Sequence, residues 1–237
     1  MATKLQKIPF GLKGELMVSV AEVQSGLACG CHCPACGEAL IARKGLKKVH
    51  HFAHHSDADC PSAFETSVHL MAKQIIAQEK RLTTPQLTLR GRDTDSDGFP
   101  TWQELTIPEA NVRFSSVETE KEVSNLKIDA VGRNHRGAEL LIEFFVTHEV
   151  PGEKKDKIRD LRKSAIEIDL SDVSYSVTEA KLRYLIVEST KNKRWISGAR
   201  YHSHREKLLA KKESKEEVWP ERKGVLQLRN KYRHLYP

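Results

Sequence analysis

The chain has 237 residues, of which 39% are hydrophobic and 30% are charged, a composition with enough apolar material for a globular core. The formal net charge of +7 favours a polyanionic partner such as DNA or RNA but says nothing about the fold. No run reaches the ~18 apolar residues that span a bilayer, and the N-terminal sequence lacks the apolar core and cleavage site of a signal peptide. We therefore expect a cytoplasmic protein without a membrane partner.

The first third of the chain predicts short strands and one long helix. A strand is expected over residues 15–20, and a hairpin of strands 39–43 and 47–53 is expected around the Lys44-Gly45-Leu46 turn. A helix is expected over residues 63–80, because its apolar residues recur at helical spacing.

The rest of the chain predicts more strands and two helices. Strands are expected over residues 85–89, 101–107, 111–117, 126–131, 139–147 and 166–170, and helices over 153–165 and 177–187. The tail from Arg205 to Arg233 carries ten Lys/Arg against five Glu. These features suggest an N-terminal strand and small module over 1–60, an α/β (α+β) domain over 61–190 and a basic tail over 191–237.

Residues 93–104 match the calcium-loop pattern of an EF-hand, with Asp93, Asp97 and Gly98 followed by Glu104. That motif needs a helix on each side, and the flanking segments are expected to be extended. We therefore interpret it as a solvated acidic turn between strands.

Five cysteines and five histidines lie within the 32 residues from Cys29 to Cys60. Disulfides are rare in a reducing compartment, so this density predicts a structural zinc site, with a cluster of free thiols and surface histidines as the alternative. Cys33 and Cys36 share one knuckle. We expect His54 and Cys60 to complete the site, with His51 as the competing ligand; Cys29, Cys31, His50 and His55 are adjacent substitutes.

Two acidic residues lie in very apolar strands of the predicted central hairpin. A three-residue loop at His135-Arg136-Gly137 would place Asp129 opposite Glu143. Paired carboxylates repel unless a cation such as Mg²⁺ lies between them. The pair therefore predicts a metal site, and an exposed face with solvated acids is the alternative.

The predicted helix over 63–80 carries polar residues four apart on one face, Glu65, His69 and Lys73. This stripe either is solvated or faces the pair of acids.

The order and spacing of these motifs resemble the competence protein CoiA-like family. The matching motifs are Cys33-Pro-Ala-Cys36, Lys44-Gly45, His51-Phe-Ala-His54, Cys60, Glu65-Thr-Ser-Val-His69, Ile128-Asp129, Ile142-Glu143, Val146-Thr-His148 and Ile166-Glu-Ile-Asp-Leu170. The resemblance implies a zinc-binding N-terminal module and a PD-(D/E)XK, restriction-endonuclease-like domain with a mixed sheet flanked by helices. It also implies that Asp129 and Glu143 bind a catalytic Mg²⁺ or Mn²⁺, with Glu65 as an accessory acid.

The chain departs from the family pattern two residues after Glu143, where Phe145 replaces the expected Lys or polar residue. A cation at that position helps to orient water or to stabilise developing negative charge. Lys154 and Lys157, at the start of the next helix, are the main candidates to replace it, with His148 and Lys73 as others. A solvated first helical turn is the alternative for the two lysines.

The function that follows is metal-dependent hydrolysis of phosphodiester bonds in DNA, with RNA as the other candidate substrate. The resemblance implies that this activity serves DNA processing, in competence or in the handling of foreign DNA. The alternatives are a nucleic-acid-binding module that has lost catalysis and a zinc-stabilised scaffold that binds another protein or a second copy of the chain.

Overall fold

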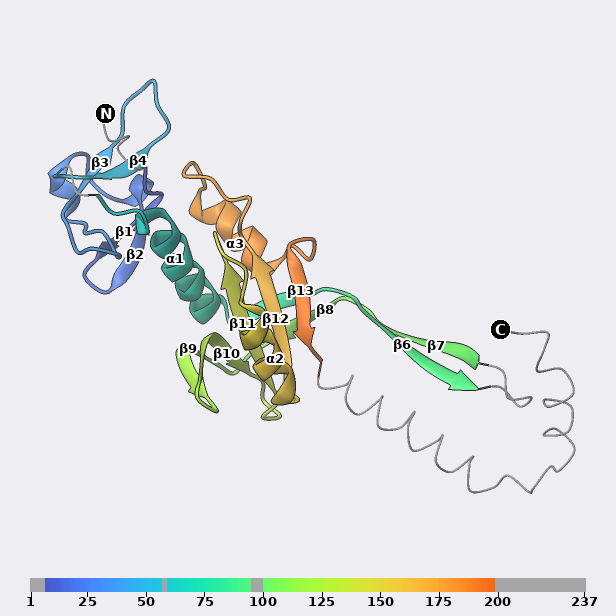
Figure 1. Ribbon diagram of the computed structural model, residues 1–237. Coiled ribbons are helices and arrows are strands. Elements are labelled where there is room, and N and C mark those ends of the chain that lie inside the picture. The colour runs from blue at the N-terminus through green and yellow to red at the C-terminus, as the bar shows by residue number, and fades with distance from the viewer. Residues whose placement is uncertain (1–6, 57–58, 95–99, 199–237) are drawn as a thin grey trace, which may run out of the picture. The chain divides into compact units, whose positions relative to one another are not determined.

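The computed structural model describes residues 7–56, 59–94 and 100–198, and its centre is a mixed five-stranded sheet (Figure 1). The strands lie in the order β13-β12-β11-β10-β9. Their bounds are β9 Ser116–Val123, β10 Leu126–Arg133, β11 Glu139–Phe145, β12 Ser164–Asp169 and β13 Lys193–Ser197. Only β11 and β12 are parallel, because α2 carries the chain from one to the other.

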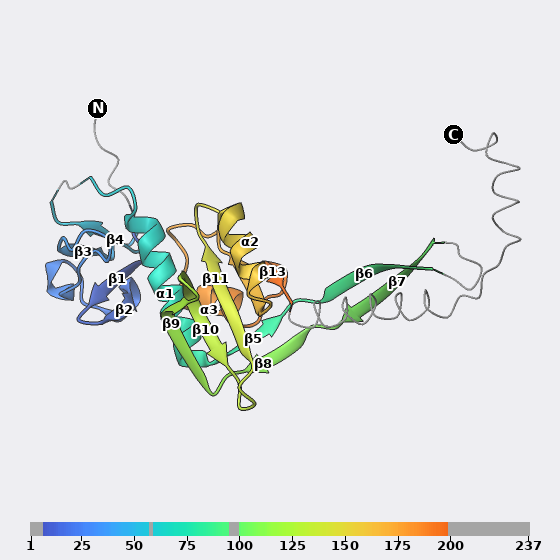
Figure 2. The ribbon, with the colours of Figure 1, turned by 60° about the horizontal axis from the view of Figure 1, so that its bottom comes forward.

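Three α-helices within the described residues pack on the sheet (Figure 2). α1 (Ala63–Glu79) and α3 (Glu179–Val187) share one apolar core with β10, β11 and β12. α2 (Gly152–Asp160) contributes Ile158 to a second apolar cluster with Leu141 and Ala165. Since side chains alternate along a strand, these clusters lie on opposite faces of the sheet. The mixed α/β class that the sequence predicts is thus confirmed.

The β10–β11 hairpin has the loop predicted for it. Asn134 and Ala138 close the turn through a 2.9 Å backbone hydrogen bond, and Gly137 has φ 78°, which suits a residue without a Cβ. The side chain of Asn134 also accepts hydrogen bonds from the Arg136 and Ala138 amides, at 2.9 and 3.0 Å. The turn therefore determines which residues of the two strands face each other.

The N-terminal segment forms a small module of two hairpins. β1 (Phe10–Lys13) pairs with β2 (Leu16–Ser19), and β3 (Leu40–Arg43) pairs with β4 (His51–His54). Two short 3-10 turns, η1 Val20–Glu22 and η2 Leu27–Cys29, lie between the hairpins. Gln74 on α1 exchanges hydrogen bonds of 2.8 and 2.9 Å with the Met17 backbone, which fastens the module to the helix.

Two further strand pairs lie outside the central sheet. β5 (Arg81–Thr84) pairs with β8 (Ala110–Arg113), and β6 (Leu87–Thr94) and β7 (Pro100–Ile107) form a hairpin. Residues 88–105 belong to a separate compact unit. Extended strands on both sides of the acidic segment exclude the helices that an EF-hand needs.

Several predicted boundaries were wrong. The helix predicted over 153–165 ends at Asp160, because Arg162 has a left-handed φ of 53° and β12 begins at Ser164. The strand predicted over 111–117 is two strands, because Phe114 pairs with Lys80 and Ser115 with Arg133. Pro85 does not open a strand; it lies between β5 and β6, where its carbonyl accepts a 2.9 Å hydrogen bond from Trp195 Nε1. β1, β5 and β13 were not predicted, and most of β9 was missed.

Within the described residues, no helix is both long and apolar enough to cross a membrane. The basic tail lies outside the part of the chain that the structure describes, apart from its first residues, which include β13. The predicted division at residues 60 and 190 stays a prediction.

Candidate metal centres

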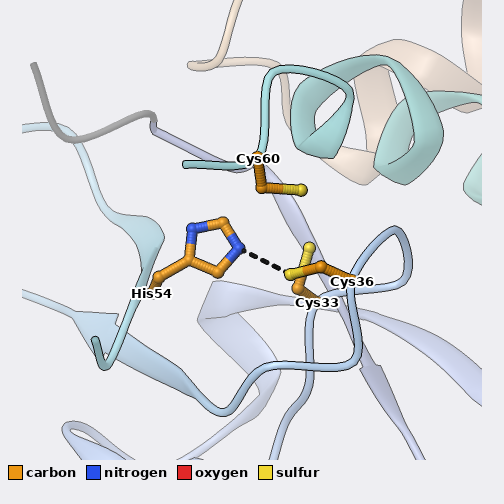
Figure 3. Close-up of side chains that lie close together, drawn as sticks. All are labelled: Cys33, Cys36, His54 and Cys60. Atoms are coloured by element: carbon orange, nitrogen blue, oxygen red, sulfur yellow. Dashed lines mark hydrogen bonds between the residues drawn. The ribbon is translucent and has the colours of Figure 1, made fainter. Parts of the chain in front are cut away.

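Four side chains from three separate segments converge in the N-terminal module (Figure 3). The ligand atoms of Cys33, Cys36, His54 and Cys60 all lie within 4.8 Å of one another, and His54 Nε2 is 3.3 Å from Cys36 Sγ. Ligands around a tetrahedral zinc ion are roughly 3.5–4 Å apart, given Zn–S and Zn–N bonds of about 2.3 and 2.1 Å. The four residues preferred from the sequence are therefore those that the fold brings together.

Local backbone structure places each of these ligands. The Cys33–Cys36 knuckle is closed by hydrogen bonds of 2.8 Å from Gly37 N to Cys33 O and from Cys33 N to Glu38 O, with Gly37 at φ 77°. His54 ends β4, and Cys60 lies three residues before α1. The knuckle, the strand end and the helix start thus each supply ligands.

The other histidines and cysteines considered as ligands have different partners or positions. His51 and His54 are three residues apart on β4 and so lie on opposite faces of the strand; His51 Nδ1 contacts Val49 O at 2.8 Å. Cys29 and Cys31 are packed in the module core, where the Cys29 thiol donates to Leu40 O at 3.1 Å. His50 and His55 are exposed.

The electrostatics of the Cys/His cluster suit a cation. Burial raises the pKa of Cys33 to about 11, and burial together with the Cys36 sulfur raises the pKa of Cys60. A divalent ion reverses this preference because its charge stabilises the thiolates. The cluster could hold a metal such as zinc. With four protein ligands and no position for water, such an ion would stabilise the module and would not catalyse.

The second candidate centre lies where β10 and β11 diverge. Their pairing ends at Ala130 and Ile142, and one further step along the same register brings Asp129 opposite Glu143, as predicted. On its other side, Asp129 faces Glu120, which has a left-handed φ of 54° and is skipped in the β9–β10 pairing. The backbone pairing of β10 with both neighbours is therefore interrupted at Asp129.

Asp129 is held by three donors. His69 Nε2 lies 3.0 Å from Asp129 Oδ2, Lys73 Nζ lies 3.3 Å from Oδ1, and the Phe144 amide donates to Oδ2 at 2.9 Å. Burial opposes ionisation of Asp129, but the His69 hydrogen bond and the Lys73 charge outweigh it and hold the pKa well below its usual value. Asp129 is thus a permanently charged, oriented carboxylate.

Glu143 differs from Asp129 in that its pKa is raised instead of lowered. Its side chain is almost fully buried, and burial together with the negative charge of Asp129 raises its pKa to about 7. Lys154 Nζ lies 2.8 Å from Oε2, whereas Oε1 is buried and has no hydrogen-bond partner among the residues that the structure describes. A buried acceptor without a donor costs free energy, so the position favours an added cation or proton.

The helix face predicted from the spacing of Glu65, His69 and Lys73 does turn toward the acids. His69 and Lys73 contact Asp129, and Lys73 also pairs with Glu120. Glu65 lies farther along, with its Oε1 at 3.8 Å from His148 Nδ1. The stripe is therefore not simply solvated.

The two candidate lysines differ in position. Lys154 reaches Glu143, whereas Lys157, three residues later, is exposed on the outer side of α2. Because Lys154 contacts Glu143 and Lys157 is exposed, replacement of Lys157 can serve as the control for replacement of Lys154.

Sequence reasoning missed a further buried acid. Glu167 on β12 is in register with Glu143 and is held by Lys155 at 3.1 Å and Arg194 at 2.9 Å. The signal was available: Glu167 interrupts an apolar run between Ile166 and Ile168 in the same way that Glu143 interrupts its own. Which cations neutralise Glu167 could not be predicted without knowing the order of the strands in the sheet.

Comparison with known proteins bears on the N-terminal module. The family model described as "Competence protein CoiA, N-terminal domain" matches residues 24–63, which include all four members of the Cys/His cluster. No curated protein and no solved structure matches the chain. The resemblance to the CoiA-like family is thereby confirmed over this segment.

Proposed function

We propose that the chain is a metal-dependent nuclease that hydrolyses phosphodiester bonds in DNA, with Mg²⁺ or Mn²⁺ held by Asp129 and Glu143. The proposal assigns the five-stranded sheet and its helices to the PD-(D/E)XK class. RNA is the other candidate substrate, and both endonuclease and exonuclease cleavage are compatible with the site.

The observation that carries the proposal is the unsatisfied Glu143 Oε1, buried beside the ionised Asp129. Two adjacent carboxylates, one of them with a free buried oxygen, match the oxygen ligands that Mg²⁺ prefers. A bound divalent cation would supply an activated water and neutralise charge on the phosphate. The donor set therefore fits such an ion.

The remaining residues of the site orient these acids and supply positive charge. His69 and Lys73 fix the Asp129 carboxylate from α1, and Lys154 fixes one oxygen of Glu143 from α2. Lys73 and Lys154 bring cations to the acids from two helices, although Phe145 occupies the family's lysine position. A cation near a developing phosphorane stabilises its charge, and we assign that role to Lys154.

The test is plasmid and oligonucleotide cleavage with Mg²⁺, Mn²⁺ or EDTA, using folded, zinc-loaded protein. Asp129→Ala and Glu143→Ala are each expected to abolish cleavage, because a single carboxylate holds Mg²⁺ weakly. Lys154→Ala is expected to lower the rate about 10- to 100-fold, and Lys157→Ala serves as the matched control with an unchanged rate. Wild-type protein that cuts no DNA or RNA under these conditions would refute the nuclease assignment.

The second candidate function is a nucleic-acid-binding module without catalysis. Two observations favour this alternative. Lys73 and Lys154 already neutralise both acids, and Phe145 occupies the position of the family's lysine. A gel shift in Ca²⁺ that retains DNA while Mg²⁺ and Mn²⁺ give no cleavage would select this alternative. Absence of binding as well would favour a protein-binding scaffold.

A further inference from the structure

A cavity of about 820 Å³ lies on the α3 side of the chain and shares no residue with either candidate metal centre. It is bounded by the loop after β12, by α3 and by the turn that leads into β13. Its polar lining includes Asp169, Ser174, Ser176, Thr178, Tyr184 and Asn192. The volume falls in the range of pockets that hold small organic ligands, about 300–1,000 Å³.

Asn192 braces the cavity wall. Its Nδ2 donates to Asp169 O at 3.1 Å and to Leu185 O at 3.2 Å, which fixes the orientation of the amide. These bonds link the end of β12 to α3, so two sides of the cavity are held together.

Two exposed tyrosines accompany the cavity, each with a lysine over its ring. Tyr184 lines the cavity, is 52% exposed, and has Lys181 Nζ at 5.2 Å from its ring centroid. Tyr175 lies between two lining serines, is 37% exposed, and has Lys7 Nζ at 4.1 Å from its ring centroid. An exposed aromatic ring beside a lysine offers a stacking surface for a base and a partner for a phosphate.

From these features together we propose that the cavity binds a nucleotide unit of single-stranded nucleic acid, with a base stacked at Tyr184 and the strand's phosphates near Lys181 and Lys7. This names the substrate class of the proposed nuclease and rests on that function. The strand must be unpaired, because bases in a duplex are stacked on each other and their hydrogen-bonding edges are engaged.

The charge of the lining supports recognition of a base rather than of phosphate alone. The lining carries two lysines, Lys181 and Lys191, and two aspartates, Asp169 and Asp172, so its net charge is about zero. Within the described residues Lys181 forms no ion pair with either aspartate, and Asp169 is engaged by the amide and hydroxyl of Ser171 at 2.9 and 2.6 Å. A nearly neutral wall with hydroxyls favours a polar, uncharged group such as a base. The lysines at Tyr184 and Tyr175 then supply the attraction for the backbone.

The experiment measures binding of a fluorescent single-stranded DNA 12-mer to the full, zinc-loaded chain by anisotropy in Ca²⁺ without Mg²⁺ or Mn²⁺, the same condition as the gel shift. Tyr184→Ala is expected to weaken binding about 5- to 100-fold, and Tyr184→Phe is expected to retain wild-type affinity because the ring remains. Lys181→Ala should weaken binding and reduce its salt dependence, whereas Lys13→Ala, an exposed lysine on β1, is the control. Binding of the duplex form should be unchanged by Tyr184→Ala.

Because Tyr184 is half exposed, its replacement leaves the core intact, and an unchanged melting temperature verifies this. Tyr184→Ala protein that binds the single strand like wild type, or that loses single-strand and duplex binding equally, overturns the proposal. Competition by free dTMP as effective as the 12-mer at equal nucleotide concentration would overturn assignment to a strand. Failure of the nuclease would instead appear as normal binding in Ca²⁺ with no cleavage in Mg²⁺ or Mn²⁺.

Discussion

Replacement of Glu143 by Gln should make the metal-free protein more stable at pH 8 and should hardly change it at pH 4. Burial, followed by the charge of Asp129, raises the pKa of Glu143 from 4.5 to about 7. A carboxyl group with a raised pKa binds its proton more tightly in the folded chain than in the unfolded chain. Wild-type stability therefore falls as pH rises from about 4.5 through about 7.

The magnitude follows from the difference between the two pKa values. At roughly 1.4 kcal/mol per pH unit, the interval from 4.5 to about 7 corresponds to about 3 kcal/mol. Gln is nearly isosteric with Glu and does not ionise, so the variant escapes this loss. The protonated Glu143 side chain and the glutamine side chain of the variant both lack the charge that Lys154 pairs with, so loss of that ion pair cancels at low pH.

Urea denaturation in EDTA at pH values from 4 to 8 measures the effect as the difference in free energy of unfolding between variant and wild type. Glu139→Gln, on the same strand, is the control with the opposite sign. Hydrogen bonds from Arg133 and Lys163 lower the pKa of Glu139 to about 2. That variant should be less stable than wild type at pH 8, with a deficit that shrinks as pH falls below 4.5.

A difference between Glu143→Gln and wild type that stays constant from pH 4 to pH 8 would refute the reasoning. Added Mn²⁺ or Mg²⁺ extends the test, because binding to the folded state stabilises wild type at pH 8 by mass action. The Gln variant, with one ionised ligand fewer, should respond less.

Purified protein should contain about one zinc per chain, as metal analysis would show. Cys33→Ser should lose the zinc and lower the melting temperature, whereas Cys31→Ala should retain the zinc, and thermal melts check the difference. Gly132→Ala should cost about 1–3 kcal/mol, because the added Cβ would lie 2.6 Å from the Phe114 ring, whereas Gly152→Ala meets open space and should be neutral in the same denaturation assay. Deletion of residues 199–237 should weaken DNA binding and flatten its salt dependence in a titration, and an unchanged slope would assign the basic tail another role.

The sequence alone predicted much of the architecture because the relevant signals are local. Helical spacing identified α1, and apolar runs identified β10, β11 and β12. The Gly137 turn then determined a register, so the opposition of Asp129 and Glu143 could be derived from a three-residue loop. Likewise, alternation along β4 allows only one of its two histidines to face the cysteines, although the sequence does not say which.

Features that depend on distant segments needed the tertiary structure. The order of β11, β12 and β13 decides that Glu167 lies beside Glu143 and near Arg194. Helix α1 brings His69 and Lys73 to Asp129 across 60 and 56 residues of chain, and this docking, together with the Phe144 amide, lowers the pKa of that carboxyl.

Residue types and spacing thus determined the kinds of site that this chain can form, namely a Cys/His cluster and an acidic pair. The tertiary structure decided which members meet, which are neutralised and which atom remains unsatisfied. The physical reason is that hydrogen bonds and charges act over a few ångströms in space, and separation along the chain does not specify those distances until the elements have packed.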